Sequence, residues 1–207
     1  MTPVAIFYSP FPTKFGIPRQ AGVVSEIPGT IIFEKPFRTP DAIRGLEGFD
    51  FIWIIWQSAA TNSSPTVRPP RLGGNTRVGV FASRSPQRPN PIGLSSVRIS
   101  HIDYDAPEGP VIHVLGADIM DGTPILDIKP YIPYTDSHPE ARGGFTDTTD
   151  WHPLKVVGTD DPVLKQILEQ DPRPQYHDDP NRVYGMQYNG KDIHFHVKGK
   201  TLFIIDE

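Results

Sequence analysis

The sequence contains no cysteine, which excludes disulfide bonds, thiolate metal sites and cysteine nucleophiles. It contains no long apolar run either, so neither a membrane span nor a signal peptide is predicted, and a soluble cytoplasmic protein is expected. The Gly-rich phosphate loop, the Rossmann fingerprint and the Gly-x-Ser-x-Gly elbow are also missing. His194 and His196 stand two apart, but no further ligand has metal-binding spacing, so no metal is predicted.

Acidic residues are absent from Phe51 to Ile102, although the whole chain has a net charge of -4. Lysine is absent from Arg68–Gly93 within that region, yet this stretch contains five arginines. Arginine binds phosphate and carboxylate groups in a bidentate way, and the surrounding prolines and glycines restrain the backbone. The stretch therefore predicts oxyanion recognition. A solvated, proline-rich surface connection is the alternative, although the apolar pattern VGVFA in its middle argues against a disordered linker.

The 24 prolines and 18 glycines predict many turns and short strands rather than long helices. The segment Phe49–Trp56 is the most apolar run, and its β-branched and aromatic residues are typical of a strand buried on both faces. Further strands are expected at Val4–Tyr8, Thr30–Phe33, Arg77–Ala82, Ser95–Ile102, Val111–Leu115 and Ile125–Ile128. The connections leave almost no room for crossover helices, which favours an antiparallel barrel or sandwich. The fold class is therefore mainly β, with an antiparallel β-barrel domain over residues 1-137.

A small C-terminal α+β domain is predicted over residues 138–207. The polar, glycine-containing stretch 137–150 is interpreted as a linker. Asp161 and Pro162 begin a short helix with an apolar stripe. Three alternating strands follow, and Asn189-Gly190 is a hairpin turn between the first two.

Two groups of polar residues are candidates for chemistry. Asp118 and Asp121 precede a Gly-Thr-Pro turn, where they could hold an ammonium group or ribose hydroxyls or lie near a sulfonium; an ordinary solvated turn is the alternative. Asp127, Lys129 and Tyr131 alternate, which places them on one face of an extended segment. A general acid or base could come from this second set, but no spacing selects one. These patterns alone predict a β-rich protein that binds oxyanions, and no reaction.

Several motifs together resemble the TrmO family, also called YaeB or TsaA-like. They are PRQ at Pro18–Gln20, TVRPPRLGG at 66–74, GVFASRSPQRPNPIG at 79–93, DGTPILDIKPYIP at 121–133, DPRP at 171–174 and RVYG at 182–185. The resemblance covers nearly the whole chain. It implies a methyltransferase that depends on S-adenosylmethionine and modifies N6 of threonylcarbamoyl-adenosine beside the tRNA anticodon. It also implies a β-barrel with a small C-terminal domain, and a cofactor near a homodimer interface.

The resemblance also implies the site residues. The cofactor pocket would be formed by Pro18, Arg19, Gln20, Arg84, Leu94, Asp118, Ile119, Met120, Asp121 and Gly122. The tRNA residues follow from chemistry rather than from the resemblance, because arginines can bind the carboxylate and phosphates of such a substrate and tyrosines can stack on bases. The candidates are Arg68, Arg71, Arg88, Asn90, Arg173, Arg182 and Tyr184, with Tyr176 also available for stacking. One departure concerns Ala59-Ala60, which stand where the family often has His-Gln. This change affects one edge of the pocket, and substrate choice with it.

Two other functions remain alternatives. One is a non-catalytic β-barrel module that binds RNA or a nucleotide, and the other is a methyltransferase of the same fold that acts on a small metabolite. The C-terminal domain is expected to recognise the shape of tRNA. Its removal is therefore expected to leave cofactor binding within about threefold.

Overall fold

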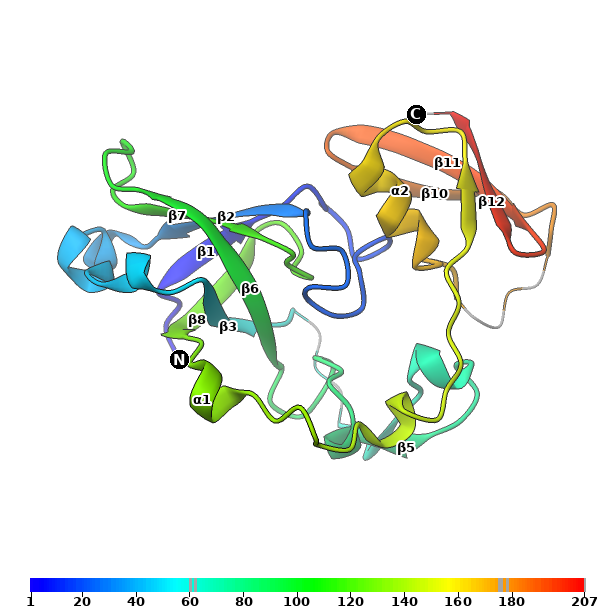
Figure 1. The fold of residues 1–207 in the computed structure, drawn as a ribbon, viewed down its shortest axis with the longest axis horizontal. Coiled ribbons are helices and arrows are strands. Elements are labelled where there is room, and N and C mark those ends of the chain that lie inside the picture. Colours follow the sequence, from blue (N-terminus) through cyan, green and yellow to red (C-terminus); the bar gives the residue numbers. More distant parts are fainter. Residues whose placement is uncertain (60, 62, 175–176, 178, 207) are drawn as a thin grey trace.

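The computed structural model describes residues 1–59, 61, 63–174, 177 and 179–206. Six strands form a closed antiparallel barrel on one side of the molecule (Figure 1). In barrel order they are β1 (Ala5–Tyr8), β2 (Pro28–Phe33), β7 (Val111–Leu115), β6 (Ile92–Asp103), β3 (Phe51–Gln57) and β8 (Thr123–Pro130). The prediction of a mainly β protein with an antiparallel barrel is confirmed.

Strand β3 differs from the prediction, because only one of its faces is buried. Ile52 and Ile54 point into the barrel and are fully buried, whereas Phe51 on the other face is 41% exposed. An antiparallel barrel covers only the inner face of each strand, so a very apolar strand does not need a second covering layer. The outer face of β3 is therefore an apolar surface next to the exposed Leu94 of β6, which pairs with Ile55.

The arginine-rich stretch forms short elements beside the barrel rather than a barrel strand. Only Val78–Gly79 (β5) is extended, and it pairs with Thr66–Val67 (β4); the predicted strand Arg77–Ala82 is otherwise wrong. A 3-10 helix, Val80–Ala82, follows directly. Other short helices are 3-10 turns at Lys35–Phe37, Pro40–Ile43, Leu46–Gly48, Pro70–Leu72 and Gly144–Thr146, and the α-helix α1 at Pro133–Asp136. In the described part of the chain, no helix is long and apolar enough to cross a membrane.

The C-terminal part is a four-stranded sheet with one helix, of which the helix and three strands were predicted. Helix α2 (Pro162–Glu169) begins where expected, since the Asp161 side chain accepts hydrogen bonds from the Val163 and Leu164 amides. The sheet order is β10 (Tyr184–Tyr188), β11 (Lys191–Lys198), β12 (Thr201–Asp206) and β9 (Lys155–Val157). The parallel strand β9 was not predicted.

The two parts of the molecule share a hydrophobic core. Phe11, Val24 and Ile27, which lie in the loop between β1 and β2, are fully buried in the same cluster as helix α2 and the C-terminal sheet. The Phe11 ring lies 5.3 Å from that of Tyr188, between centroids. The loop approaches the sheet closely, since a Cβ atom on Gly16 would lie 2.4 Å from the Met186 methyl group. Residues 9–27 thus pack with the C-terminal part although they lie inside the N-terminal half of the chain.

Candidate active site

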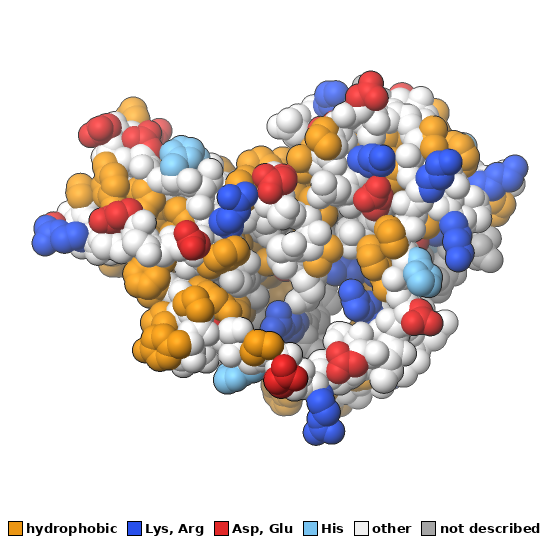
Figure 2. All heavy atoms as spheres, viewed as in Figure 1, with side chains coloured by type: hydrophobic (Ala, Val, Ile, Leu, Met, Phe, Trp, Pro, Cys, Tyr) orange, Lys and Arg blue, Asp and Glu red, His pale blue; other side chains and the backbone are white. Residues whose placement is uncertain are grey.

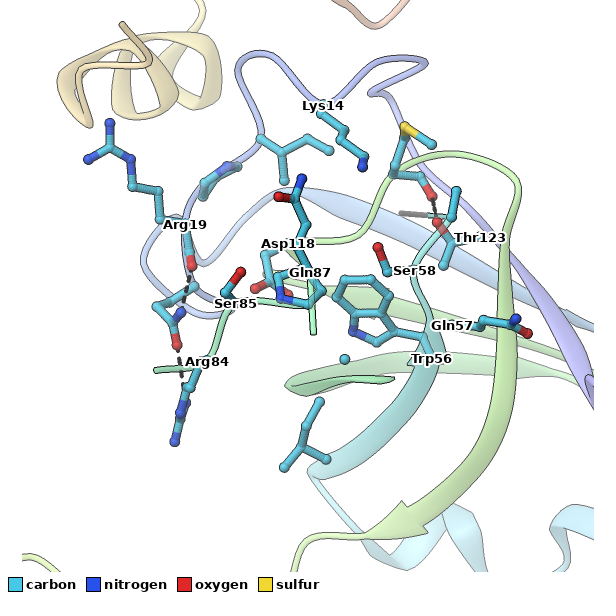
Figure 3. A pocket seen from close by; sticks show the side chains of 18 of the residues that line it. Lys14, Arg19, Trp56, Gln57, Ser58, Arg84, Ser85, Gln87, Asp118 and Thr123 are labelled. Carbon is cyan, nitrogen blue, oxygen red and sulfur yellow. Dashed lines mark hydrogen bonds between the residues drawn. The ribbon is translucent and has the colours of Figure 1, made fainter. Parts of the chain in front are cut away.

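A cavity of 590 Å³ opens at one end of the barrel (Figure 3). This volume lies within the usual range for sites that bind a small molecule. Five segments form its wall: residues 14–20 of the β1–β2 loop, the end of β3, the turn 84–87, the start of β6 at Gly93 and Leu94, and the segment 118–124 that leads into β8. The wall therefore combines residues that are far apart in the sequence, and Figure 3 shows Asp118, Ser58, Gln87 and Trp56 close to its centre.

A chain of hydrogen bonds lies at the base of this cavity. The Trp56 indole N–H donates to Ser95 Oγ at 3.0 Å, and Ser95 Oγ donates to Asp118 Oδ1 at 2.5 Å. Burial raises the pKa of the Asp118 carboxyl, while hydrogen bonds from Ser95 and from backbone amides, together with the charge of Arg84, lower it. Asp118 is the one carboxylate among the described residues that line this cavity. Its negative charge is held in a poorly solvated position that a cationic ligand group would stabilise.

The position of the Trp56 ring depends on the glycine opposite it. Gly93 on β6 pairs with Trp56 on β3, and a Cβ atom at position 93 would lie 2.1 Å from the indole ring. No side chain fits at that distance. Because Gly93 has no side chain, the Trp56 ring can lie flat against the strand and line the cavity. Trp56 was predicted to be a core residue, and it is half-buried at the cavity wall instead.

The substitution Gly93→Ala is expected to displace Trp56, lower the thermal stability and weaken ligand binding in this cavity. Forcing an extra carbon into a packed contact costs typically about 1–3 kcal/mol. Thermal unfolding and calorimetry with S-adenosylmethionine measure the two effects. Gly79→Ala is the matched control, because a Cβ atom at Gly79 meets nothing within 4 Å. Wild-type stability and affinity in Gly93→Ala would contradict this account of the ring.

Three side chains at the edge of the cavity are linked. Arg84 Nη1 donates to Gln20 Oε1 at 3.1 Å, and Gln20 Nε2 donates to the Arg19 carbonyl at 2.6 Å. The Arg19 guanidinium in turn donates to the backbone carbonyls of Asp171 and Arg173 in the C-terminal part. Burial lowers the pKa of Arg19, Asp171 raises it, and the nearby charge of Arg71 lowers it. The predicted PRQ motif is thus held by the C-terminal part and by the arginine-rich stretch Arg68–Gly93, called the arginine block below.

Most of the predicted cofactor residues line this cavity. They are Pro18, Arg19, Gln20, Arg84, Leu94, Asp118, Met120 and Gly122. Ile119 is instead a barrel core residue with 1% exposure. Asp121 lies outside the cavity wall, where its carboxylate accepts a hydrogen bond from the Ser9 amide at 2.9 Å. The side chains at 119 and 121 therefore support the segment rather than face a ligand, because alternate residues of an extended segment point in opposite directions.

The predicted candidates for a general acid or base lie on the outer side of the barrel. Lys129 Nζ forms an ion pair with Asp127 Oδ2 at 3.1 Å, and both side chains are well exposed. The Tyr131 ring packs against Phe51 and Trp53. None of the three candidates lines the cavity. Their shared face was predicted correctly, and barrel closure turns that face outward. Their role as a general acid or base stays a prediction, and the lining of this cavity does not support it.

The arginine block borders a second cavity of 910 Å³. Arg68 and Arg71 line it, and Arg19 and Arg84 lie between the two cavities and border both. Arg88 lines neither, because its guanidinium lies 5.6 Å above the Phe81 ring and donates to the carbonyls of Ser83 and Ser85. The predicted substrate role of Arg88 therefore stays a prediction that neither cavity supports. Asn90 also lies outside both cavities, and its carbonyl accepts a hydrogen bond from Ile92 N.

The predicted tRNA-binding residues of the C-terminal part make contacts within this part of the molecule. The Tyr184 ring is 6% exposed and stacks on Phe195, so it offers no free face to a base. Arg182 covers that ring at 5.4 Å. Arg173 forms a two-pronged ion pair with Asp171 at 2.8 and 2.9 Å, with both side chains largely buried. Tyr176 lies outside the described residues.

Sequence reasoning missed several cavity residues. They are Lys14, Ile17, Trp56, Gln57, Ser58, Ser85, Pro86, Gln87, Gly93, Thr123 and Pro124. The recognised motifs could have indicated some of these residues, because Ser85, Pro86, Gln87 and Gly93 lie within the RSPQRPNPIG stretch. Ala59, one half of the departure from the family pattern, does line the cavity, whereas Ala60 lies outside the described residues. Among the residues described, no group of three or more His, Asp or Glu side chains could hold a metal ion.

Comparison with known proteins decides the family. The profile of the tRNA-methyltransferase O N-terminal domain matches residues 6–137, and that of the TrmO C-terminal domain matches residues 156–206. The tRNA (adenine(37)-N6)-methyltransferase of Escherichia coli K12 is 35% identical over 216 residues, which cover 94% of this chain and 91% of that protein. This chain belongs to the TrmO family. The resemblance noted from its motifs is confirmed.

Other TrmO relatives agree. A putative S-adenosylmethionine-dependent methyltransferase of Pseudomonas aeruginosa PAO1, RcsF, is 36% identical over 95% of this chain and 91% of its own length. The crystal structure of TrmO from P. aeruginosa superposes with a TM-score of 0.80 at 30% identity, covering 99% of this chain and 94% of that one. A structural match over nearly the whole chain includes the C-terminal part as well as the barrel.

Proposed function

We propose that this protein transfers a methyl group from S-adenosylmethionine to N6 of adenine 37 in tRNA. The observation that supports this most directly is the cavity at the end of the barrel, where the PRQ motif, Arg84 and Asp118 meet in a protein of the TrmO family. Relatives across the whole chain are named as tRNA (adenine(37)-N6)-methyltransferases and S-adenosylmethionine-dependent methyltransferases. The expected compartment of such an enzyme is the cytoplasm.

The charges of the first cavity match those of S-adenosylmethionine. The buried Asp118 carboxylate suits a cationic group, either the ammonium or the sulfonium. Arg19 and Arg84 at the edge suit a carboxylate, which arginine binds in a bidentate way. The half-buried Trp56 ring provides an aromatic surface against which an adenine or a sulfonium can pack. The cavity thus contains a suitable partner for each polar end of this molecule.

The cofactor supplies a methyl group bonded to a positively charged sulfur; its transfer to N6 leaves a neutral thioether and releases the N6 proton. The task of the chain is then to hold the two reactants in line and exclude competing water. Asp127, Lys129 and Tyr131, the predicted acid or base candidates, lie outside the cavity, so positioning by Arg19, Gln20 and Arg84 contributes most. The substrate form with a threonylcarbamoyl group on N6 agrees with this site, because Arg68 and Arg71 border the neighbouring cavity and suit its carboxylate.

Mass spectrometry of tRNA nucleosides tests the function. The purified protein is incubated with S-adenosylmethionine and tRNA from cells that lack this enzyme, and the nucleosides are compared before and after. A mass gain of one methyl group on the nucleoside at position 37 is expected. Cofactor binding without any methylation of tRNA would favour the non-catalytic module, and methyl transfer that occurs without tRNA would favour a small-metabolite enzyme.

A homodimer completes this proposal. Leu94 on β6 is 54% exposed on the barrel surface and also lines the first cavity, so the edge of the cavity is an open apolar surface. Phe51 and Ile92 extend this exposed apolar surface on β3 and β6. A second copy placed there would bury these side chains and close the cavity on its open side.

The substitution Leu94→Glu is expected to convert a dimer into a monomer, because a carboxylate would be buried at the contact between the two copies. Light scattering at micromolar concentration measures the change. Val157→Glu is the matched control. Val157 is similarly exposed (42%), but it belongs to β9 of the C-terminal sheet and not to the barrel. A wild-type monomer that methylates tRNA at full rate would overturn the dimer proposal.

A further inference from the structure

The second cavity is formed by several segments of the chain and is more than a shallow depression in the surface. Its volume is 910 Å³, large enough for a nucleotide. Residues 19–23, 67–71, 81–86 and 143–151 enclose it together with Gln170. The space-filling view shows a hollow between the two lobes of the molecule with basic side chains at its border (Figure 2). The segment 143–151 thus forms one wall of a cavity, although all of it except Trp151 lies in the stretch 137–150 that was interpreted as a linker.

The charge of this cavity has one sign. Arg19, Arg68, Arg71 and Arg84 line it, and none of the described lining residues is acidic. Arg19 and Arg71 lie close enough for Arg71 to lower the pKa of Arg19. Like charges held together in a partly desolvated wall repel, and an anion between them relieves that repulsion. The lining therefore favours a ligand with phosphate or carboxylate groups.

The same cavity also has aromatic walls. Phe145 and Trp151 come from the segment 143–151, and Phe81 comes from the arginine block. Phe81 is 81% exposed although it is a large apolar side chain, and Arg88 lies against its ring. Aromatic rings beside arginines are the combination by which proteins bind an unstacked base and its backbone phosphates. The two kinds of lining residue thus indicate one class of ligand, a nucleotide of a single-stranded region.

The segment 143–151 is held by its own hydrogen bonds. The Gly143 amide donates to Asp147 Oδ2 at 2.6 Å, Thr146 Oγ1 donates to the Gly143 carbonyl at 2.9 Å, and Thr149 Oγ1 donates to the Phe145 carbonyl at 3.0 Å. These bonds connect the 3-10 turn Gly144–Thr146 to the residues immediately before and after it. An ordered turn positions the Phe145 ring, which a flexible linker would not do.

The two cavities adjoin each other. Both are lined by Arg19, Gln20, Arg84, Ser85 and Pro86. Methyl transfer requires the donor carbon and the acceptor nitrogen to approach within about 3–3.5 Å before reaction. A donor in the first cavity and an acceptor base in the second would meet beside Gln20 and Arg84. This geometry gives the second cavity a place in the reaction.

We propose that the second cavity binds the target nucleotide of the tRNA, with its base against Trp151 and Phe145 and its anionic groups on Arg68 and Arg71. The inference rests on the proposed function and adds a site to it: the segment 143–151 is a substrate-binding element. The proposed site also explains a preference for one region of the tRNA. A base must leave its stack to enter the cavity, which favours a nucleotide in a loop such as the anticodon loop.

The test compares two substitutions of one residue. Trp151→Phe keeps an aromatic ring, whereas Trp151→Leu keeps apolar bulk without a flat π-face. Loss of base stacking lowers affinity by about 5- to 150-fold. Trp151→Leu is therefore expected to raise the KM for tRNA by a factor in this range, while Trp151→Phe stays within about threefold of the wild type. Calorimetry should give both variants wild-type affinity for S-adenosylmethionine, and Phe145→Ala should behave as Trp151→Leu does.

A structural role for the ring would have a different signature. If Trp151 only packed the segment, Leu and Phe would act alike, and thermal unfolding would report the loss. Tyr134→Ala is the control for removing an exposed aromatic ring, because Tyr134 is 90% exposed and lines neither cavity. Equal KM values for Trp151→Leu, Phe145→Ala and the wild type would overturn the inference.

The inference and the proposed function fail separately. If the wild type methylates tRNA and the variants match it, only the inference fails. If the wild type does not methylate tRNA, filter binding of the same tRNA decides: weaker binding by Trp151→Leu but not by Trp151→Phe supports the nucleotide site without the reaction. Equal binding by the three proteins refutes it.

Discussion

Asp118→Asn is expected to weaken the binding of S-adenosylmethionine by about 10- to 150-fold, the range for losing a hydrogen bond to a charged group. The substitution keeps the shape of the side chain, and its Oδ1 atom can still accept the hydrogen bond from Ser95 Oγ. It removes the negative charge that faces the first cavity. Calorimetry measures the affinity. Asp121→Asn is the matched control, because Asp121 is in the same segment but lies outside the cavity wall. This control variant should bind S-adenosylmethionine as tightly as the wild type.

The same variant is expected to be more stable than the wild type when no cofactor is bound. Burial raises the pKa of Asp118 above that of the unfolded chain. A raised carboxyl pKa contributes stability that is complete below the unfolded pKa and is lost as pH rises through the folded pKa. Asn has no such dependence. The stability gain of Asp118→Asn should therefore be small at low pH and grow toward neutral pH.

Thermal unfolding between pH 4 and pH 8 measures this difference. Each kcal/mol of penalty that is removed raises the unfolding midpoint by about 2–4 °C for a protein of this size. A variant that binds the cofactor as tightly as the wild type would show that Asp118 does not contact it. A variant that is less stable at neutral pH would show that the carboxylate is stabilised, not strained, in the free protein.

Removal of residues 138–207 is expected to abolish cofactor binding or reduce it more than tenfold. The sequence had suggested that the barrel keeps its affinity without the C-terminal part. The shared core argues otherwise, because truncation would expose Phe11, Val24 and Ile27, which are at most 1% exposed. Full burial of each such side chain is worth about 1.5–3 kcal/mol, so three together approach the whole stability of a typical domain. Arg19 would also lose its two acceptor carbonyls.

Calorimetry on the truncated chain and on the full chain measures the loss. The double substitution Lys198→Glu, Lys200→Glu is the control, because it changes the exposed surface of the C-terminal part and leaves the shared core intact. Its cofactor affinity should equal that of the wild type. A truncated protein that is folded and binds S-adenosylmethionine within threefold of the full chain would contradict the role assigned to residues 9–27.

The sequence by itself determined the family, the β-rich class and several of the segments that line the first cavity. The PRQ motif, the arginine block and the segment 118–122 are short runs whose residue types and spacing carry the information locally. The cap of helix α2 and the Asn189-Gly190 hairpin were predictable for the same reason, since each depends on neighbouring residues in the chain.

Only the tertiary structure decided which segments meet and which faces point inward. Closure of the barrel turned Asp127, Lys129 and Tyr131 outward, and strand register placed Trp56 opposite Gly93 at the cavity wall. Packing assigned residues 9–27 to the C-terminal core. It also made the polar segment 143–151 one wall of the second cavity. These contacts join residues far apart in the chain, and such contacts depend on the burial of apolar surface across the whole fold rather than on any local pattern.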